Sequence, residues 1–184
     1  GGLDGGVLFY DTENTFRGER ILQMADHIGL EKDALNAIIL APCLTSDHQL
    51  FILEHSDKFI KDNNIRLLIV DSLMAHYRSE FIGRESLAER QQRLNKYMRK
   101  LSRMAKAFNL AVVVTNQAID DPSFFGVPKP TGGNIVAHSS VTRVWLRRPK
   151  QIGAERIARL IESPWLPSGE EVFLITERGI EDKN

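Results

Sequence analysis

Ile65-Arg-Leu-Leu-Ile-Val-Asp-Ser72 is the stretch of sequence that decides the fold. Five of its first six residues are large and aliphatic, a run too continuous for a strand with one face in water. We therefore predict a strand covered on both sides, as in the parallel sheets of α/β proteins. An acid, Asp71, and a hydroxyl, Ser72, follow at once. At the carboxyl end of such a strand, a lone carboxylate either holds a metal ion or only opens the next loop.

Two further apolar runs end in the same way. Val7–Tyr10 leads into Asp11-Thr12-Glu13-Asn14, and Leu110–Val114 leads into Thr115-Asn116-Gln117. If the three strands are parallel, their polar ends meet at one edge of the sheet. A binding site at that edge explains the pattern better than the same loop chemistry repeated three times by chance.

The composition limits the classes of function. The 184 residues suit one domain, and 42% hydrophobic with 26% charged residues is ordinary for a globular protein. A formal net charge of +0 excludes nucleic-acid binding by overall charge, so that role needs a local patch. Cys43 is the only cysteine, which excludes an internal disulfide and predicts a buried thiol in a reducing compartment. Without a signal peptide or a membrane-spanning apolar run, we expect an intracellular protein.

Helices are predicted between the strands. Asn14 or Thr15 is expected to cap the first, and Thr45 or Ser46 the second, whose Phe59 is expected to face the core. A long helix follows over roughly residues 85–108, with an apolar stripe that repeats every seven residues. The stripe consists of Leu87, Leu94, Leu101 and Phe108.

The other faces of this long helix carry seven Lys/Arg residues against two acids. The excess of positive charge is either a solvated face or the border of a polyanion.

The last third of the chain changes character. Residues 118–131 contain three prolines and one glycine and predict a long loop, and residues 132–138 predict a short helix. Three antiparallel strands are expected over 141–148, 156–161 and 171–176, where basic and apolar residues alternate. The fold class is therefore α/β: a mainly parallel central sheet flanked by helices, with antiparallel strands at the carboxyl end.

Several segments together resemble a known family, the archaeal RadA and eukaryotic strand-exchange recombinases. They are Asp-Thr-Glu-Asn-Thr-Phe-Arg (11–17), Leu-Leu-Ile-Val-Asp-Ser (67–72), Ala-Glu-Arg-Gln-Gln (88–92), Thr-Asn-Gln (115–117), Gly-Gly-Asn-Ile-Val-Ala-His (132–138) and Ile-Thr-Glu-Arg-Gly-Ile-Glu-Asp (175–182). The likeness runs in order along almost the whole chain.

The resemblance implies a RecA-like P-loop ATPase core that uses ATP and Mg²⁺. In its complete form such a protein assembles as a filament or ring on single-stranded DNA, pairs it with double-stranded DNA and exchanges strands. Recombination mediator proteins are implied as further partners. The implied location is the cytoplasm or nucleoid of an archaeon, or the nucleus of a eukaryote.

The resemblance also implies roles for individual residues at the nucleotide. Asp71 matches the acid that orients Mg²⁺ through water, and Glu13 matches the general base that polarises the attacking water. Gln117 matches the amide that senses the γ-phosphate. Arg17 or Arg20 is expected either along the adenine or in a surface ion pair.

Two more residues match positions at a subunit boundary. His138 matches a residue at that boundary near the nucleotide, although an ordinary helix-end histidine explains it nearly as well. Glu162 stands where relatives usually carry aspartate, in a segment that caps the neighbouring nucleotide.

For DNA, residues 78–90 match the family's first binding loop and residues 118–131 the second. Cations on phosphates and apolar side chains against bases hold single strands; the alternative is an interface between protomers. The candidate contacts are Arg78, Phe81, Arg84, Arg90, Phe124, Phe125 and Lys129.

The chain departs from the family pattern in its phosphate loop and in its second DNA segment. No lysine follows a glycine anywhere, so the phosphate-cradling Gly-x-x-x-x-Gly-Lys loop is missing. Asp120-Asp121 stands where the family tends to carry an arginine. We therefore expect residues 1–184 to be one partial core domain, without the phosphate loop, the amino-terminal DNA-binding domain or the polymerisation linker.

Three hypotheses follow. The first is the carboxyl-terminal part of a RadA-like core, a DNA-dependent ATPase when complete and inactive as this piece. The second is a non-hydrolysing paralogue or accessory module that binds recombinase subunits or DNA. The third is a bare scaffold that holds partners.

Overall fold

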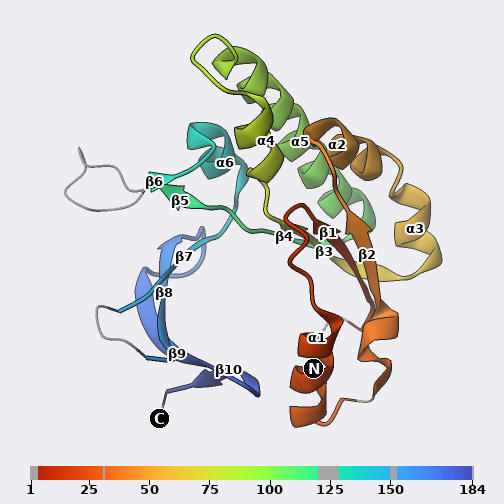
Figure 1. Cartoon of the computed structure of the whole chain (residues 1–184), viewed down its shortest axis with the longest axis vertical. Coiled ribbons are helices and arrows are strands. Elements are labelled where there is room, and N and C mark those ends of the chain that lie inside the picture. The colour runs from red at the N-terminus through yellow and green to blue at the C-terminus, as the bar shows by residue number, and fades with distance from the viewer. Residues whose placement is uncertain (1–3, 31, 120–128, 150–152, 184) are drawn as a thin grey trace. The chain divides into compact units, whose positions relative to one another are not determined.

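A computed structural model describes residues 4–30, 32–119, 129–149 and 153–183 (Figure 1). The chain divides into two compact units. The first comprises residues 1–16 and 36–139, and the second comprises residues 17–35 and 140–184. Each unit is built around its own four-stranded sheet.

The sheet of the first unit is entirely parallel. Its strands are β1 (Gly6–Asp11), β2 (Ile38–Pro42), β3 (Ile65–Asp71) and β4 (Ala111–Val114), in the order β2-β1-β3-β4. Strands β1, β3 and β4 are the three apolar runs identified in the sequence, and their carboxyl ends share one edge. The predicted α/β class, with a parallel sheet and a separate antiparallel one, is confirmed.

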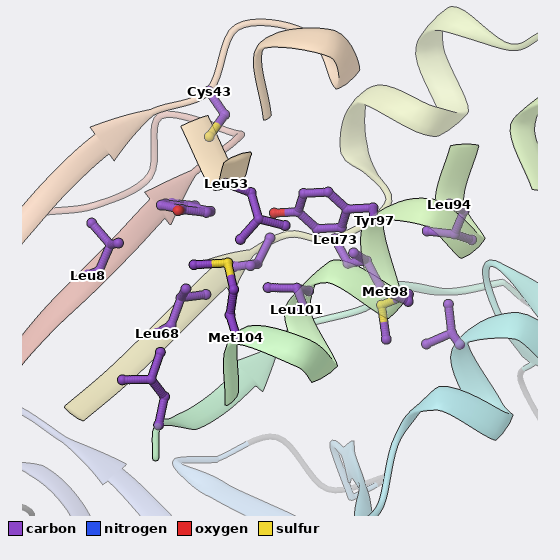
Figure 2. Packing of buried hydrophobic residues seen from close by; sticks show 14 of the residues in the cluster. Leu8, Cys43, Leu53, Leu68, Leu73, Leu94, Tyr97, Met98, Leu101 and Met104 are labelled. Atoms are coloured by element: carbon purple, nitrogen blue, oxygen red, sulfur yellow. The ribbon is translucent and has the colours of Figure 1, made fainter. Parts of the chain in front are cut away.

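Helices of the first unit cover one face of this sheet (Figure 1). The elements that follow the strands are α2 (Ser46–Glu54), α3 (Asp57–Asp62), α4 (Ala75–Glu80), α5 (Leu87–Phe108), the pair β5 (Ala118–Ile119) and β6 (Lys129–Pro130), and α6 (Gly133–Ser139). Figure 2 shows how Leu8 and Leu68 of the sheet pack with Met98, Leu101 and Met104 of α5. This core fixes the sheet against its helices and holds the strand ends in place.

The opposite face of the sheet is only partly covered. Leu40, Phe9, Ile69 and Val113 form one row across the four strands. Leu40 is 42% exposed and Val113 is 50% exposed, while Phe9 and Ile69 are half-buried. The central strand itself has no exposed residue: Ile65, Leu68 and Val70 are buried, and the other three residues of Ile65–Val70 are half-buried. The exposed positions of the row lie on β2 and β4.

Two of the predicted helix features need correction. Thr45 does cap α2, since its Oγ1 accepts from the His48 amide at 3.0 Å. The helix ends at Glu54, however, and Phe59 lies on the separate helix α3 with 56% of its surface exposed. The break coincides with Ser56, whose hydroxyl donates back to the Ile52 carbonyl at 2.6 Å.

The second unit contains α1 (Gly18–His27), most of the short 3-10 helix η1 (Lys32–Ala37) and an antiparallel sheet. Its strands are β7 (Arg143–Arg147), β8 (Glu155–Glu162), β9 (Gly169–Thr176) and β10 (Gly179–Asp182), in the order β10-β9-β8-β7. The first three match the predicted strands. Strand β10 was missed because it has four residues and one large apolar side chain, Ile180.

Helix α1 begins later than predicted. Its first residue is Gly18, and neither Asn14 nor Thr15 caps it. The amides of Thr15 and Phe16 bind the Asp11 carboxylate instead, so these residues stay in a turn. None of the helices that the structure describes is long and apolar enough to cross a membrane.

Candidate functional site

Hydrogen bonds join the carboxyl ends of all four parallel strands. The Thr12 amide donates to the Asp71 carbonyl at 2.8 Å, which links the end of β1 to that of β3. The Cys43 amide donates to the Asp11 carbonyl at 2.8 Å and brings in β2. The Leu73 amide donates to the Thr115 carbonyl at 2.9 Å and brings in β4. The strand ends therefore form one fixed platform.

The buried Thr12 hydroxyl reinforces the central link. It accepts from the Ser72 amide at 2.7 Å and donates to the Ser72 carbonyl at 2.9 Å. A threonine that satisfies both backbone groups of one residue fixes the position of that residue and of the preceding Asp71.

Glu13 and Gln117, which are 104 residues apart, meet on this platform. Gln117 Nε2 donates to Glu13 Oε1 at 2.7 Å. The other end of the same amide, Gln117 Oε1, accepts from Nη1 of Arg78 on α4. A chain of three side chains thus runs from the end of β1 through the end of β4 to Arg78, a residue of the predicted first DNA loop.

Asp71 presents a carboxylate at the end of β3. Its Oδ1 accepts from the Thr115 hydroxyl at 2.6 Å. Beside it, the buried Ser72 hydroxyl has no hydrogen-bond partner among the described residues. An unsatisfied hydroxyl next to a carboxylate fits a hydrated Mg²⁺, because both groups can accept from its water ligands. The described residues contain no group of three or more His, Cys, Asp or Glu side chains that could hold a metal directly.

Asp11 is a site residue that sequence reasoning missed. The residue is buried, with only 4% of its surface exposed. The carboxylate accepts from the amides of Glu13 and Thr15 at 3.2 Å and of Phe16 at 3.0 Å. It therefore shapes the turn that presents Glu13. The available signal was an acid before a Thr-Glu-Asn turn, the usual place for side-chain to backbone bonds.

Cys43 lies beside this platform and is buried and free, as predicted. Burial, with a smaller contribution from the Asp11 carboxylate, raises the pKa of its thiol to about 12. A thiol that stays protonated at neutral pH has a structural role and no role as a nucleophile.

The other predicted nucleotide contacts belong to both units. Arg17, Arg20 and Glu162 belong to the second unit, and His138 is exposed in the last turn of α6 in the first. Arg20 donates to the Thr176 carbonyl at 2.5 Å and to the Glu177 carbonyl, so it joins α1 to the β9–β10 turn. Arg143 Nε donates to Glu162 at 2.7 Å. Arg17 lies at the start of α1. Their roles toward a nucleotide stay predictions.

The predicted first DNA loop is not a single loop. Arg78 lies in α4 and Arg90 lies in α5, so only residues 81–86 connect two helices. Arg84 is exposed in this connection. Phe81 is half-buried, with its ring stacked 6.4 Å from Tyr77 and the Arg93 guanidinium 5.3 Å from its centre. Phe81 thus takes part in packing the base of the connection.

The second predicted DNA segment is described only at its base. Phe124 and Phe125 lie outside the described residues, and Lys129 is placed in β6, which pairs with β5. Thr131 closes the segment, because both its amide and its hydroxyl donate to the Gln117 carbonyl at 3.0 Å. Gln117 therefore contacts Glu13 with its side chain and the base of this segment with its backbone.

A model of the Rad51 family matches residues 1–183. The chain belongs to the Rad51 family. Membership places it, at the level of the family, among RecA-like proteins of DNA recombination and repair that bind DNA. The predicted resemblance is confirmed to that extent. For this Rad51-family chain, the joined strand ends with Glu13, Asp71 and Gln117 are the candidate nucleotide site.

Proposed function

We propose that this Rad51-family chain is part of a RadA-type recombinase core and contains the residues that hydrolyse ATP. In the complete protein, this core hydrolyses ATP with Mg²⁺ while bound as a filament or ring on single-stranded DNA, and it exchanges strands with duplex DNA. The observation that carries the proposal is the hydrogen-bond chain from Glu13 through Gln117 to Arg78, which lies on the same strand ends as Asp71.

Glu13 is the group proposed to take the proton. A carboxylate held at 2.7 Å by a neutral amide keeps its orientation and its second oxygen, Oε2, for a water molecule. The water's proton moves to Glu13 as its oxygen attacks the terminal phosphorus. ATP supplies the phosphoanhydride that is cleaved, and Asp71 with Ser72 would hold hydrated Mg²⁺, which neutralises phosphate charge.

Gln117 is proposed to couple this chemistry to DNA. One amide group contacts both the base, Glu13, and a cation of the first DNA segment, Arg78. A phosphate that attracts Arg78 would change the hydrogen bonding of Gln117 and hence the orientation of Glu13. The Gln117 carbonyl is also bound by Thr131 at the base of the second DNA segment.

The test of this mechanism is ATP hydrolysis by the complete protein carrying Glu13→Gln. We expect the DNA-stimulated rate to fall by about 10²- to 10⁴-fold, the usual contribution of a general base. Glu177→Gln, an exposed acid in the β9–β10 turn, is the matched control and should leave the rate unchanged. An unchanged rate in Glu13→Gln would exclude Glu13 as the base.

The proposed DNA contact is tested separately on single-stranded DNA. Arg84→Ala should weaken binding and reduce the slope of log affinity against log salt by about 0.7, the value for one phosphate contact on a single strand. If both quantities stay at the parent values, Arg84 does not contact DNA.

A non-hydrolysing accessory module is the second candidate. Backbone amides and the lysine of a Gly-x-x-x-x-Gly-Lys loop provide much of the binding of a triphosphate, so the two candidates differ in whether the complete protein contains that loop. We expect residues 1–184 alone to bind ATP poorly and not to turn it over. A complete protein that contains no such loop and does not hydrolyse ATP would establish the accessory role.

A further inference from the structure

One face of α5 is strongly basic, and the proposed nucleotide and DNA contacts do not use it. From Lys96 to Phe108 this helix carries five Lys or Arg residues and no acid, in a chain whose formal net charge is +0. Such a local excess in a neutral protein is the electrostatic pattern of a polyanion site.

These cations line a groove. The groove has a volume of about 480 Å³ and is open to solvent. Its lining residues are Glu54 of α2 and Gln92, Asn95, Lys96, Arg99, Lys100 and Arg103 of α5. Positions 92, 96, 99, 100 and 103 repeat at three- and four-residue spacing, which places them on one side of the helix.

Most of the charge in the groove is uncompensated. Lys96 pairs with Glu54 at 3.1 Å. Within the part of the chain that the structure describes, Arg99, Lys100 and Arg103 have neither an ion pair nor a side-chain hydrogen bond. Lys106, one turn further along, is also exposed and without such a partner among those residues.

Helix stability does not explain the arrangement. Cations stabilise a helix through its dipole only within the last turn, and there α5 carries Lys106 alone. Pairs of like charge three or four residues apart, such as Lys96 with Lys100, destabilise an isolated helix. A ligand that supplies negative charge would remove this repulsion.

We propose that the α5 basic face, defined as Lys96, Arg99, Lys100 and Arg103, binds the phosphate backbone of duplex DNA. The groove lining contains no aromatic side chain, so it offers nothing on which unpaired bases could stack. It also contains no apolar residue to anchor an acidic peptide. Apart from Glu54, the lining residues are cations and amides, and these suit phosphates, which need only charge and hydrogen-bond donors.

The geometry suits a duplex. From Lys96 to Arg103 the helix rises by about 10 Å, and each strand of a B-form duplex carries one phosphate for about every 3.4 Å of its axis. About three phosphates of one strand therefore lie within the length of the basic face.

The test uses the 184-residue chain without nucleotide and a fluorescent duplex of about 20 bp, with salt varied from about 50 to 200 mM. Arg99→Gln with Arg103→Gln should weaken duplex binding about 10- to 100-fold at 100 mM salt and reduce the salt slope by about 1.8. Lys58→Gln with Arg178→Gln removes the same charge elsewhere and should have little effect. All four side chains are exposed, so folding should be preserved, which circular dichroism checks.

A variant that is expected to bind duplex DNA more tightly provides an independent test. Glu54→Gln removes the acid that pairs with Lys96 and should tighten duplex binding several-fold.

Unchanged affinity in the Arg99/Arg103 variant, or an equal loss in the control, would overturn the proposal. It is also overturned if the Arg99/Arg103 variant loses single-stranded binding to the same extent, or if a poly-glutamate peptide of equal charge displaces the duplex. These outcomes do not depend on ATP hydrolysis, so they are separable from failure of the proposed mechanism.

Discussion

At the scale of residues, the site depends on side chains that fix other side chains. Glu13, Asp71 and Gln117 follow three different strands, and each has a hydrogen-bond partner that orients it. The sequence could predict their meeting, because parallel strands bring their carboxyl ends to one edge. It could not predict Arg78 on Gln117, since that contact depends on where α4 lies relative to β4.

Asp11 should matter more for stability than its place in a turn implies. Asp11→Asn replaces one acceptor oxygen with an amide donor that faces three backbone N–H groups. We expect a loss of about 1–3 kcal/mol in the free energy of unfolding, measured by urea denaturation. Asp4→Asn, which changes an exposed acid, is the control and should cost less than about 0.5 kcal/mol. Equal effects would show that the Asp11 bonds do not hold the turn.

Cys43 should be nearly unreactive in the folded chain. Burial raises the pKa of its thiol from 9.0 to about 12, so at pH 9 about one thiol in a thousand is ionised when folded and about half when unfolded. The stabilisation from the neutral thiol is complete below pH 9 and is lost as the pH rises toward 12. Labelling by a thiol reagent at pH 9 should therefore be more than about 100-fold slower without urea than with it. Similar rates would contradict the burial of the thiol.

At the scale of elements, α5 shows what a periodic pattern can and cannot determine. The seven-residue stripe correctly predicted the helix and the burial of Leu94 and Leu101. It treated Leu87 as equivalent, although Leu87 is 43% exposed. Leu87 is the first residue of the helix, and a periodic pattern does not show how well the end of a helix is packed.

Replacing Leu101 or Leu87 with alanine should lower the stability of the protein by different amounts. Leu101→Ala should cost about 2–5 kcal/mol, because Leu101 is 2% exposed and its loss leaves a cavity against the sheet. Leu87→Ala should cost less than about 1 kcal/mol. Unfolding in urea, followed by far-ultraviolet circular dichroism, measures both. A Leu87 variant as damaged as the Leu101 variant would mean that the amino end of α5 packs more closely than described.

The other elements also divide into those that the sequence could predict and those that it could not. The parallel strands, the long helix and three antiparallel strands could be predicted from apolar runs and alternation. The start of α1, the break between α2 and α3, and the split of residues 78–90 between two helices could not. In the first two cases a polar side chain binds the backbone locally, through Asp11 and Ser56, and competes with the helix.

At the scale of the whole molecule, family membership and the joined strand ends support one account. The Rad51 family match covers residues 1–183, and the proposed chemistry uses residues from β1, from β3 and from the end of β4. The DNA-facing proposals extend from the same unit, through Arg78 and through α5. The account therefore treats Glu13, Asp71 and Gln117 as parts of one working site.

The most direct test is a double-variant comparison of DNA-stimulated ATP hydrolysis by the complete protein, with Glu13→Gln, Gln117→Ala and both together. Because Gln117 is proposed to act through Glu13, each single change should lower the rate. The combined variant should be no slower than Glu13→Gln alone. Losses that multiply, or single variants that hydrolyse ATP at the parent rate, would contradict a shared site.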